Sequence, residues 1–153
     1  MSICRLRVAL LVLALLPPGA AQAAPRVIEL TQVPCQFVES EYGGDQGFDA
    51  TSAEQCKAIN AAGGDRRVQR AEPLRLPPGD YIFRVTNKNV SYALGFWLRG
   101  KGLVARATLP SVSGGGLTRG HSLDYRITLE PGEYLYSCPL NPTPDYPLVV
   151  TEP

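Results

Sequence analysis

The chain of 153 residues is poor in histidine, methionine and charge. It has one His, one Met, which is the initiator, and 19% charged residues, with 15 Lys+Arg against 14 Asp+Glu. A single histidine cannot supply a His-Glu-x-x-His zinc motif, and there is no Gly-x-Ser-x-Gly elbow, so hydrolytic chemistry has no recognisable site. Sparse and nearly balanced charge also argues against a nucleic-acid partner.

The chain also lacks the low glycine and proline content that is typical of a helical bundle. The chain contains 15 Gly and 14 Pro, which is typical of a turn-rich β protein, and 44% hydrophobic residues. This length and apolar content predict one domain with a real core. All-α architecture is excluded.

The N-terminus has the pattern of a secretory signal peptide. Arg5 and Arg7 precede the apolar run 8–16, and the small-x-small site at 21–23 follows it. We therefore expect a signal peptide over 1–23, a mature domain over 24–153, and a periplasmic location. The run is too short for a membrane span, and no later stretch reaches 18 apolar residues, so no membrane span is expected.

The mature chain alternates short apolar segments with turns. An acidic, Gly-rich loop and a helix over 53–62, which we expect Gly63 and Gly64 to end, form an insertion at about 39–72. The Gly-rich stretch 113–116 is expected to be a flexible loop. We predict an all-β Greek-key β-sandwich with a short helical insertion between the first two strands. The expected strands are 27–31, 74–76, 81–86, 94–98, 105–109, 122–129, 134–138 and 146–151.

Two segments carry a family resemblance. The stretch LRLPPGDYIFRVTNKNVSYALGFWLRG and the later LEPGEYLYSCPLNPTPDYPLVV resemble a cupredoxin. More narrowly, they resemble the EfeO-type cupredoxin-like domains of periplasmic bacterial iron-uptake systems, which also carry a cysteine just after the first strand. The likeness covers about 27–38 and 73–151. The insertion lies outside it.

The resemblance implies an exported protein that handles iron or copper. Its role would be that of a redox or metal-binding accessory of iron transport, with a periplasmic iron-binding protein or an inner-membrane permease as partner. Whether it assists the oxidation of ferrous iron stays open. The cofactor implied is a copper or iron ion.

A type 1 blue-copper site is excluded by the available side chains. Such a site needs two imidazoles and one thiolate, usually with an axial thioether. The position where a first His ligand would stand is Leu94, and after Cys138 the pattern asks for a second His and a Met where this chain has Pro-Leu-Asn-Pro-Thr-Pro-Asp. No intense blue band is expected.

The remaining candidate metal ligands are Cys35, Cys138, Glu39, Glu41 and Asp145. Thiolates with carboxylates would suit iron or copper outside a blue site, and EfeO-type domains are thought to bind metal in this way. In an exported domain, however, a cysteine pair is more often a disulfide. We expect Cys35 and Cys138 to meet at one end of the sandwich, and consider a Cys35–Cys56 bond slightly less favoured.

Two other functions remain open. A metal-free interaction module would bind a partner through loops around Trp97 or through the insertion. A thiol/disulfide redox accessory would cycle Cys35 and Cys138 between dithiol and disulfide. Trp97 itself is expected to pack in the core, and His121 is expected on the surface.

Overall fold

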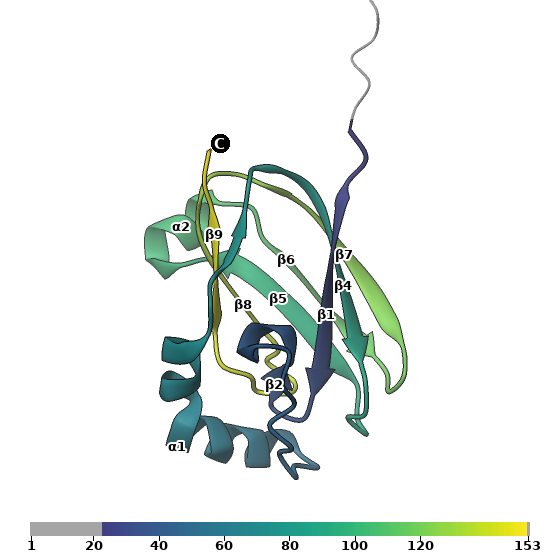
Figure 1. Ribbon diagram of the computed structural model, residues 1–153. Helices are drawn as coiled ribbons and strands as arrows, with labels where there is room; N and C mark the ends of the chain where they lie inside the picture. The colour runs from purple at the N-terminus through teal and green to yellow at the C-terminus, as the bar shows by residue number, and fades with distance from the viewer. Residues whose placement is uncertain (1–22, 153) are drawn as a thin grey trace, which may run out of the picture.

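The computed structural model describes residues 23–152, and two β-sheets make up most of it (Figure 1). The first sheet has the strand order β2-β1-β4-β7 and the second has the order β3-β9-β8-β5-β6. The strands are β1 (Arg26–Val33), β2 (Gln36–Phe37), β3 (Leu74–Leu76), β4 (Gly79–Asn87), β5 (Leu94–Gly100), β6 (Val112–Leu117), β7 (Ser122–Leu129), β8 (Gly132–Ser137) and β9 (Tyr146–Val150); the helices are α1 (Ala53–Arg70), α2 (Gly102–Thr108) and the 3-10 helix η1 (Glu39–Glu41). The expected β-sandwich with a helical insertion is confirmed.

The first sheet combines parallel and antiparallel pairing. Strand β1 runs parallel to β4, with Leu30 opposite Val85, and β4 runs antiparallel to β7. Alternate residues of β7 are buried, as the apolar–polar alternation of its sequence predicts for a strand with one face on the core. The insertion thus separates two strands that become neighbours in space.

Aromatic rings from both sheets fill the space between them. Phe96 of β5 lies at the centre, with its ring centroid 5.6 Å from that of Phe83, 5.1 Å from that of Tyr125 and 6.1 Å from that of Phe37. Stacked and edge-on pairs of this kind add to the hydrophobic gain of burial. These rings therefore form the centre of the apolar core between the two sheets.

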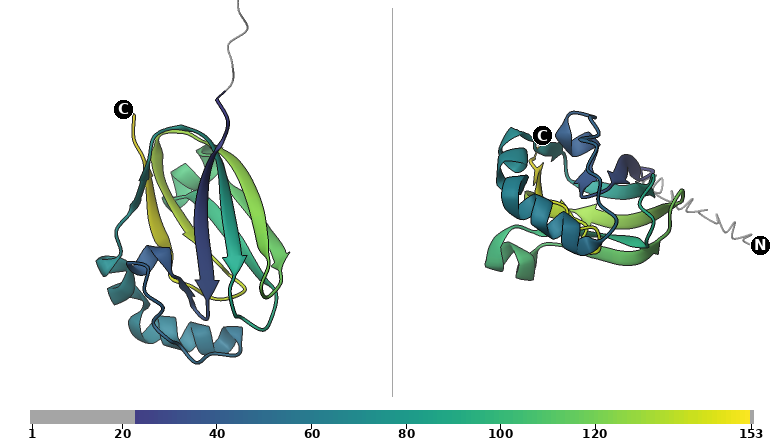
Figure 2. Two further views of the ribbon diagram at one scale, coloured as in Figure 1. Left: turned by 45° about the vertical axis from the view of Figure 1, so that its right-hand side comes forward. Right: turned by 90° about the horizontal axis from the view of Figure 1, so that it is seen from below.

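Helix α1 covers one end of the sandwich, beside β2 and the loop between β8 and β9 (Figure 2). The expectation that Gly63 and Gly64 end the helix is wrong, because α1 continues to Arg70. Gly64 is buried, and a Cβ added there would already be 3.7 Å from Pro144. Close packing on the sandwich therefore overrides the low helix propensity of the glycine pair.

Two other local expectations are corrected. The segment 105–109 belongs largely to helix α2 instead of a strand. The chain turns at Gly102, whose φ of +84° favours glycine, and folds back so closely that a Cβ on Gly100 would collide with the Ala105 carbonyl. The stretch 113–116 is part of strand β6, which pairs antiparallel with β5, instead of a flexible loop.

Between residues 23 and 152, no helix is both long and apolar enough to cross a membrane. The expected signal peptide lies, apart from Ala23, outside the described residues and stays a prediction.

Candidate functional site

Cys138 is a buried thiol directly after β8. Its Sγ accepts hydrogen bonds from the backbone N–H groups of Gly95, at 3.3 Å, and Asn141, at 3.2 Å. Burial raises the pKa of this thiol, and the amide hydrogen bonds, which favour the thiolate, offset this only in part. Without a metal ion the group is therefore a protonated thiol at neutral pH, which is a poor nucleophile.

Leu94 is the residue that the sequence resemblance places where a cupredoxin has a histidine. Its side chain is 0% exposed and belongs to the same hydrophobic cluster as Cys138. Hydrocarbon thus stands where a first imidazole would be needed.

Asn141 is the central residue of this end of the molecule, and it was not singled out from the sequence. Its Oδ1 accepts from the backbone N–H of Cys35 at 2.8 Å, while its Nδ2 donates to the Val33 carbonyl at 2.9 Å and, more weakly, to Gln32 Oε1 at 3.4 Å. The side chain therefore joins the end of β1 to the loop after β8. Its place in the short loop after Cys138, where the resemblance leads one to expect a second His and a Met, was the available signal.

The disulfide joins Cys35 to Cys56, with a Cα–Cα distance of 4.9 Å. The expectation that Cys35 meets Cys138 more readily than Cys56 is wrong. Cys35 has a φ of 64° in the tight turn between β1 and β2, and it is bonded to α1. Cys35 and Cys138 do lie at the same end, but each binds Asn141 instead of the other cysteine.

The structure does not bring the five candidate metal ligands together. Glu39 accepts from the backbone N–H of Thr31 at 2.6 Å, and Asp145 pairs with Arg99 at 2.7 Å. Glu41 pairs with Arg67 at 2.7 Å. In the described part of the chain there is no group of three or more His, Cys, Asp or Glu side chains placed to hold a metal ion.

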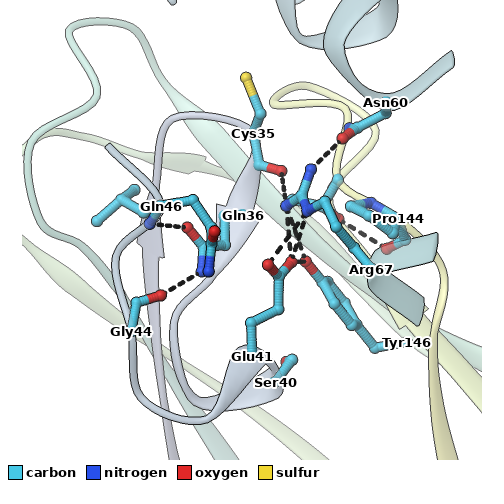
Figure 3. A network of polar contacts seen from close by, with 12 residues as sticks. Cys35, Gln36, Ser40, Glu41, Gly44, Gln46, Asn60, Arg67, Pro144 and Tyr146 are labelled. Atoms are coloured by element: carbon cyan, nitrogen blue, oxygen red, sulfur yellow. Dashed lines mark hydrogen bonds and ion pairs between the residues drawn. The ribbon is translucent and has the colours of Figure 1, made fainter. Parts of the chain in front are cut away.

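Glu41 forms a buried network with Arg67 and Tyr146 (Figure 3). The side chains of Arg67 and Glu41 are only 14% and 6% exposed. Arg67 also donates to the Cys35 carbonyl at 3.0 Å, and the Tyr146 hydroxyl donates to Glu41. Burial, reinforced by Glu41, raises the pKa of Tyr146 far above its ordinary value. The network fastens α1 to β9 and to the turn after β1.

We call this region the polar end, defined by a set of buried side chains beneath α1. A copper or iron ion does not fit it. One free thiol remains as a donor, the Asn141 amide already has partners for its oxygen and nitrogen, and the Glu41 carboxylate is neutralised by Arg67. Its members are Gln32, Cys35, Glu41, Cys56, Arg67, Cys138, Asn141 and Tyr146.

Trp97 was expected in the core, but it lies half-buried on the outer side of the second sheet. The guanidinium of Arg99 stacks 4.0 Å from its ring centroid and that of Arg106 lies 5.6 Å away. Trp97 also lines a hollow of about 350 Å³. His121 is exposed, as expected.

No family model and no curated protein matches the chain. Among solved structures, it is similar to auracyanin B, at 17% identity over 86% of this chain and 93% of that chain, with a TM-score of 0.49. It is similar to the auracyanin of Roseiflexus castenholzii at 13% identity over 84% of this chain and 99% of that chain, with a TM-score of 0.45. A multi-copper oxidase from Pediococcus acidilactici matches at 11% identity over 89% of this chain and 28% of that one, with a TM-score of 0.44.

These similarities are too distant for a conclusion about function. The chain spans less than a third of the oxidase, and every identity is below 20%. The narrower resemblance to EfeO-type domains is not tested by them and stays a prediction.

Proposed function

We propose that this chain is an exported β-sandwich module that binds another protein and works without a metal ion. The observation behind the proposal is the polar end, where the side chains that resembled metal ligands are all engaged within the protein. Asn141 bonds two segments of backbone, and Glu41 is neutralised by Arg67. A metal would have to displace these partners before gaining its own ligands.

The disulfide supports the exported location. A bond between Cys35 and Cys56 persists in oxidising compartments and is rare in the cytosol. Together with the signal-peptide pattern of residues 1–23, it favours a periplasmic protein.

The thiol/disulfide alternative is less well supported. Cys35, Cys56 and Cys138 are each 0% exposed. Exchange requires a thiolate in contact with a disulfide sulfur, and burial raises the pKa of the Cys138 thiol. A partner would have to open the polar end to reach any of these sulfurs.

The role in iron transport rests on the resemblance alone. A copper or iron ion, a periplasmic iron-binding protein and a permease remain predictions of that resemblance. They require that the five candidate ligands rearrange, because Glu39, Glu41 and Asp145 are held by other groups.

Elemental analysis of the anaerobically purified protein tests the proposal. The protein should carry no stoichiometric copper or iron, and titration with Cu(I) or Fe(II) should leave its amide NMR spectrum unchanged at the polar end. The Cys138→Ala variant is the matched control. Stoichiometric metal in the parent protein that disappears in this variant would establish metal handling instead.

A further inference from the structure

Strand β6 is an open edge of the second sheet. No strand pairs with its other side in the described sheet order, and residues 113–116 are exposed. For Val112 to Gly116, the hydrogen bonds within residues 23–152 are limited to the ladder with β5. Its backbone is thus available to an added strand.

This edge lacks the protection that the other described edge strands have. Strand β3 is three residues long and carries Arg75, and β7 carries Asp124 and Arg126 on its exposed side. Short length and charge are common ways to keep a sheet edge from pairing. Strand β6, with the sequence VSGGGL, has neither a charge nor a proline. The ladder with β5 is irregular between Leu94 and Phe96, but the strand still presents an uncharged edge that can pair with an added strand.

The hollow beside Trp97 opens on the outer face of the second sheet, over β5 and β6, next to this edge. It has a volume of about 350 Å³ and is lined by Gly95, Trp97, Ser113, Gly115 and Leu140, among others. A Cβ on Gly115 would stand 3.7 Å from a Leu140 methyl carbon, so glycine at this position keeps the hollow open. Leu140 is 48% exposed. The hollow therefore offers an apolar wall to one side chain of an added strand.

A positive charge flanks the hollow. Arg106 is exposed, lies over the Trp97 ring, and has no ion-pair partner in the part of the chain that the structure describes. Arg99, on the same ring, is already paired with Asp145. An acidic side chain in the partner would complement Arg106.

We propose that β6 binds an extended segment of a partner protein, which adds a strand to the second sheet. One apolar side chain of the segment enters the hollow, and an acidic side chain near it faces Arg106. Backbone hydrogen bonds supply affinity and the hollow supplies specificity. The proposal rests on the proposed function as a protein-binding module and states the chemistry of the partner.

A second copy of the chain would be a poorer occupant. Its own β6 would bring Ser113 and three glycines to the interface. These residues have no apolar side chain to fill the hollow and no carboxylate for Arg106.

The test uses ¹⁵N-labelled protein and a pool of capped heptapeptides of Thr and Ser. Each has Leu, Ile, Val or Phe at its centre and a Glu two positions before or after it. We expect amide shifts over 112–117 and at Trp97 and Leu140. Replacing the central residue by Ala should weaken binding roughly 10- to 150-fold, the change that corresponds to the roughly 1.5–3 kcal/mol gained by burying a Leu side chain. N-methylation of alternate backbone amides should abolish binding.

Matched variants locate the site. Gly115→Lys should remove binding, because it puts a charge on the edge and a side chain in the hollow. Gly44→Lys, at another exposed glycine with room for a Cβ, should bind as the parent does. Arg106→Glu should weaken binding about two- to fivefold, the range of an exposed ion pair, and Arg75→Glu on the far edge of the sheet should not.

Three results would overturn the proposal. They are the absence of shifts with millimolar pool, shifts confined to α2 or the polar end, and concentration-dependent shifts at β6 without peptide, which would identify a second copy as the occupant. The metal content of the protein tests the proposed function and is independent of peptide binding at β6. Bound metal together with peptide binding would contradict only the metal-independent part of the proposed function.

Discussion

The aromatic core and the polar end are both excluded from water, but they are built differently. Around Phe96 the contacts are between apolar ring faces and edges, which need no particular donor or acceptor. Beneath α1, Asn141, Arg67 and Glu41 each bind particular groups at hydrogen-bond distance. Apolar packing tolerates exchange of similar shapes, whereas a buried polar group that loses its partner costs free energy.

This difference separates two roles. The core supplies most of the gain from burial, and the polar end specifies how α1, the turn after β1 and the loop after β8 fit together. Substitutions that remove a polar partner at the polar end should therefore cost more than exchanges of similar apolar side chains in the core.

The largest expected effect is that of Arg67→Ala. Removing the guanidinium leaves Glu41 buried without its charge partner, which should lower the free energy of unfolding by about 3–5 kcal/mol. Urea denaturation measures it. Arg66→Ala, on the exposed side of the same helix, should stay within about 0.5 kcal/mol of the parent. Similar losses of stability in the two variants would show that the buried Arg67–Glu41 pair matters no more than an exposed arginine.

The next test compares Asn141→Leu with Leu98→Met, two changes that each keep the number of side-chain heavy atoms. Asn141→Leu leaves the Cys35 N–H and the Val33 carbonyl without partners and should cost about 2–4 kcal/mol. Leu98→Met, in the core, should cost less than about 1.5 kcal/mol. Chemical denaturation of both variants gives the comparison. Equal costs would remove the distinction between the regions.

Loss of the disulfide should cost about 3 kcal/mol, because the Cys35–Cys56 bond closes a loop of 21 positions. The measurement is thermal and urea unfolding of the Cys35→Ser, Cys56→Ser double variant. Reducing agent should destabilise the parent by a similar amount and leave the double variant unchanged. A reductant effect on the double variant would point to Cys138 instead.

Alkaline pH should weaken the contact between Tyr136, in the aromatic core, and Ser40, in η1. Burial raises the pKa of Tyr136 to about 12, and its hydroxyl is 2.7 Å from Ser40 Oγ. In the unfolded chain the Tyr136 hydroxyl ionises near pH 10. Its contribution to the free energy of unfolding is therefore fully present below pH 10 and is lost as the pH rises to about 12. The total is roughly 2–3 kcal/mol. Tyr136→Phe should make the pH dependence of stability less steep over this window, whereas Tyr42→Phe, at an exposed tyrosine, should leave it unchanged.

The smallest expected effect is spectroscopic. Leu94→His adds one imidazole, but a blue site needs two with a thiolate, so Cu(II) loading should give no intense blue absorption. A visible spectrum of the loaded variant checks this. A strong blue band would mean that the polar end can supply the missing ligand.

Patterns of local sequence were enough to predict the sandwich. The alternation in 122–129 matches β7. The errors arose where tertiary contacts decide the outcome. Glycines at 63–64 stay helical because α1 packs on the 138–145 loop, and the glycines of 113–116 form a strand because β5 pairs with them.

The candidate site was harder to predict because its groups come from distant segments. The acidic residues Glu39, Glu41 and Asp145 looked available as ligands, since nothing in their local sequence shows the arginine or backbone group that each one meets. Asn141 was overlooked for the same reason. Its partners lie more than 100 positions earlier in the chain.

The parallel pairing of β1 with β4 has a consequence for the kinetics of folding. These strands must find each other across the whole helical insertion, so their contact is non-local and slow to form. The Cys35–Cys56 bond lies within that connection and bypasses nearly half of it. Halving a loop lowers its closure cost by about 0.6 kcal/mol, so a chain oxidised early should reach the β1–β4 pairing roughly two- to threefold faster than a reduced one. When the disulfide forms before the strands pair, the apolar face of β1 is exposed to water for a shorter time before β1 pairs with β4.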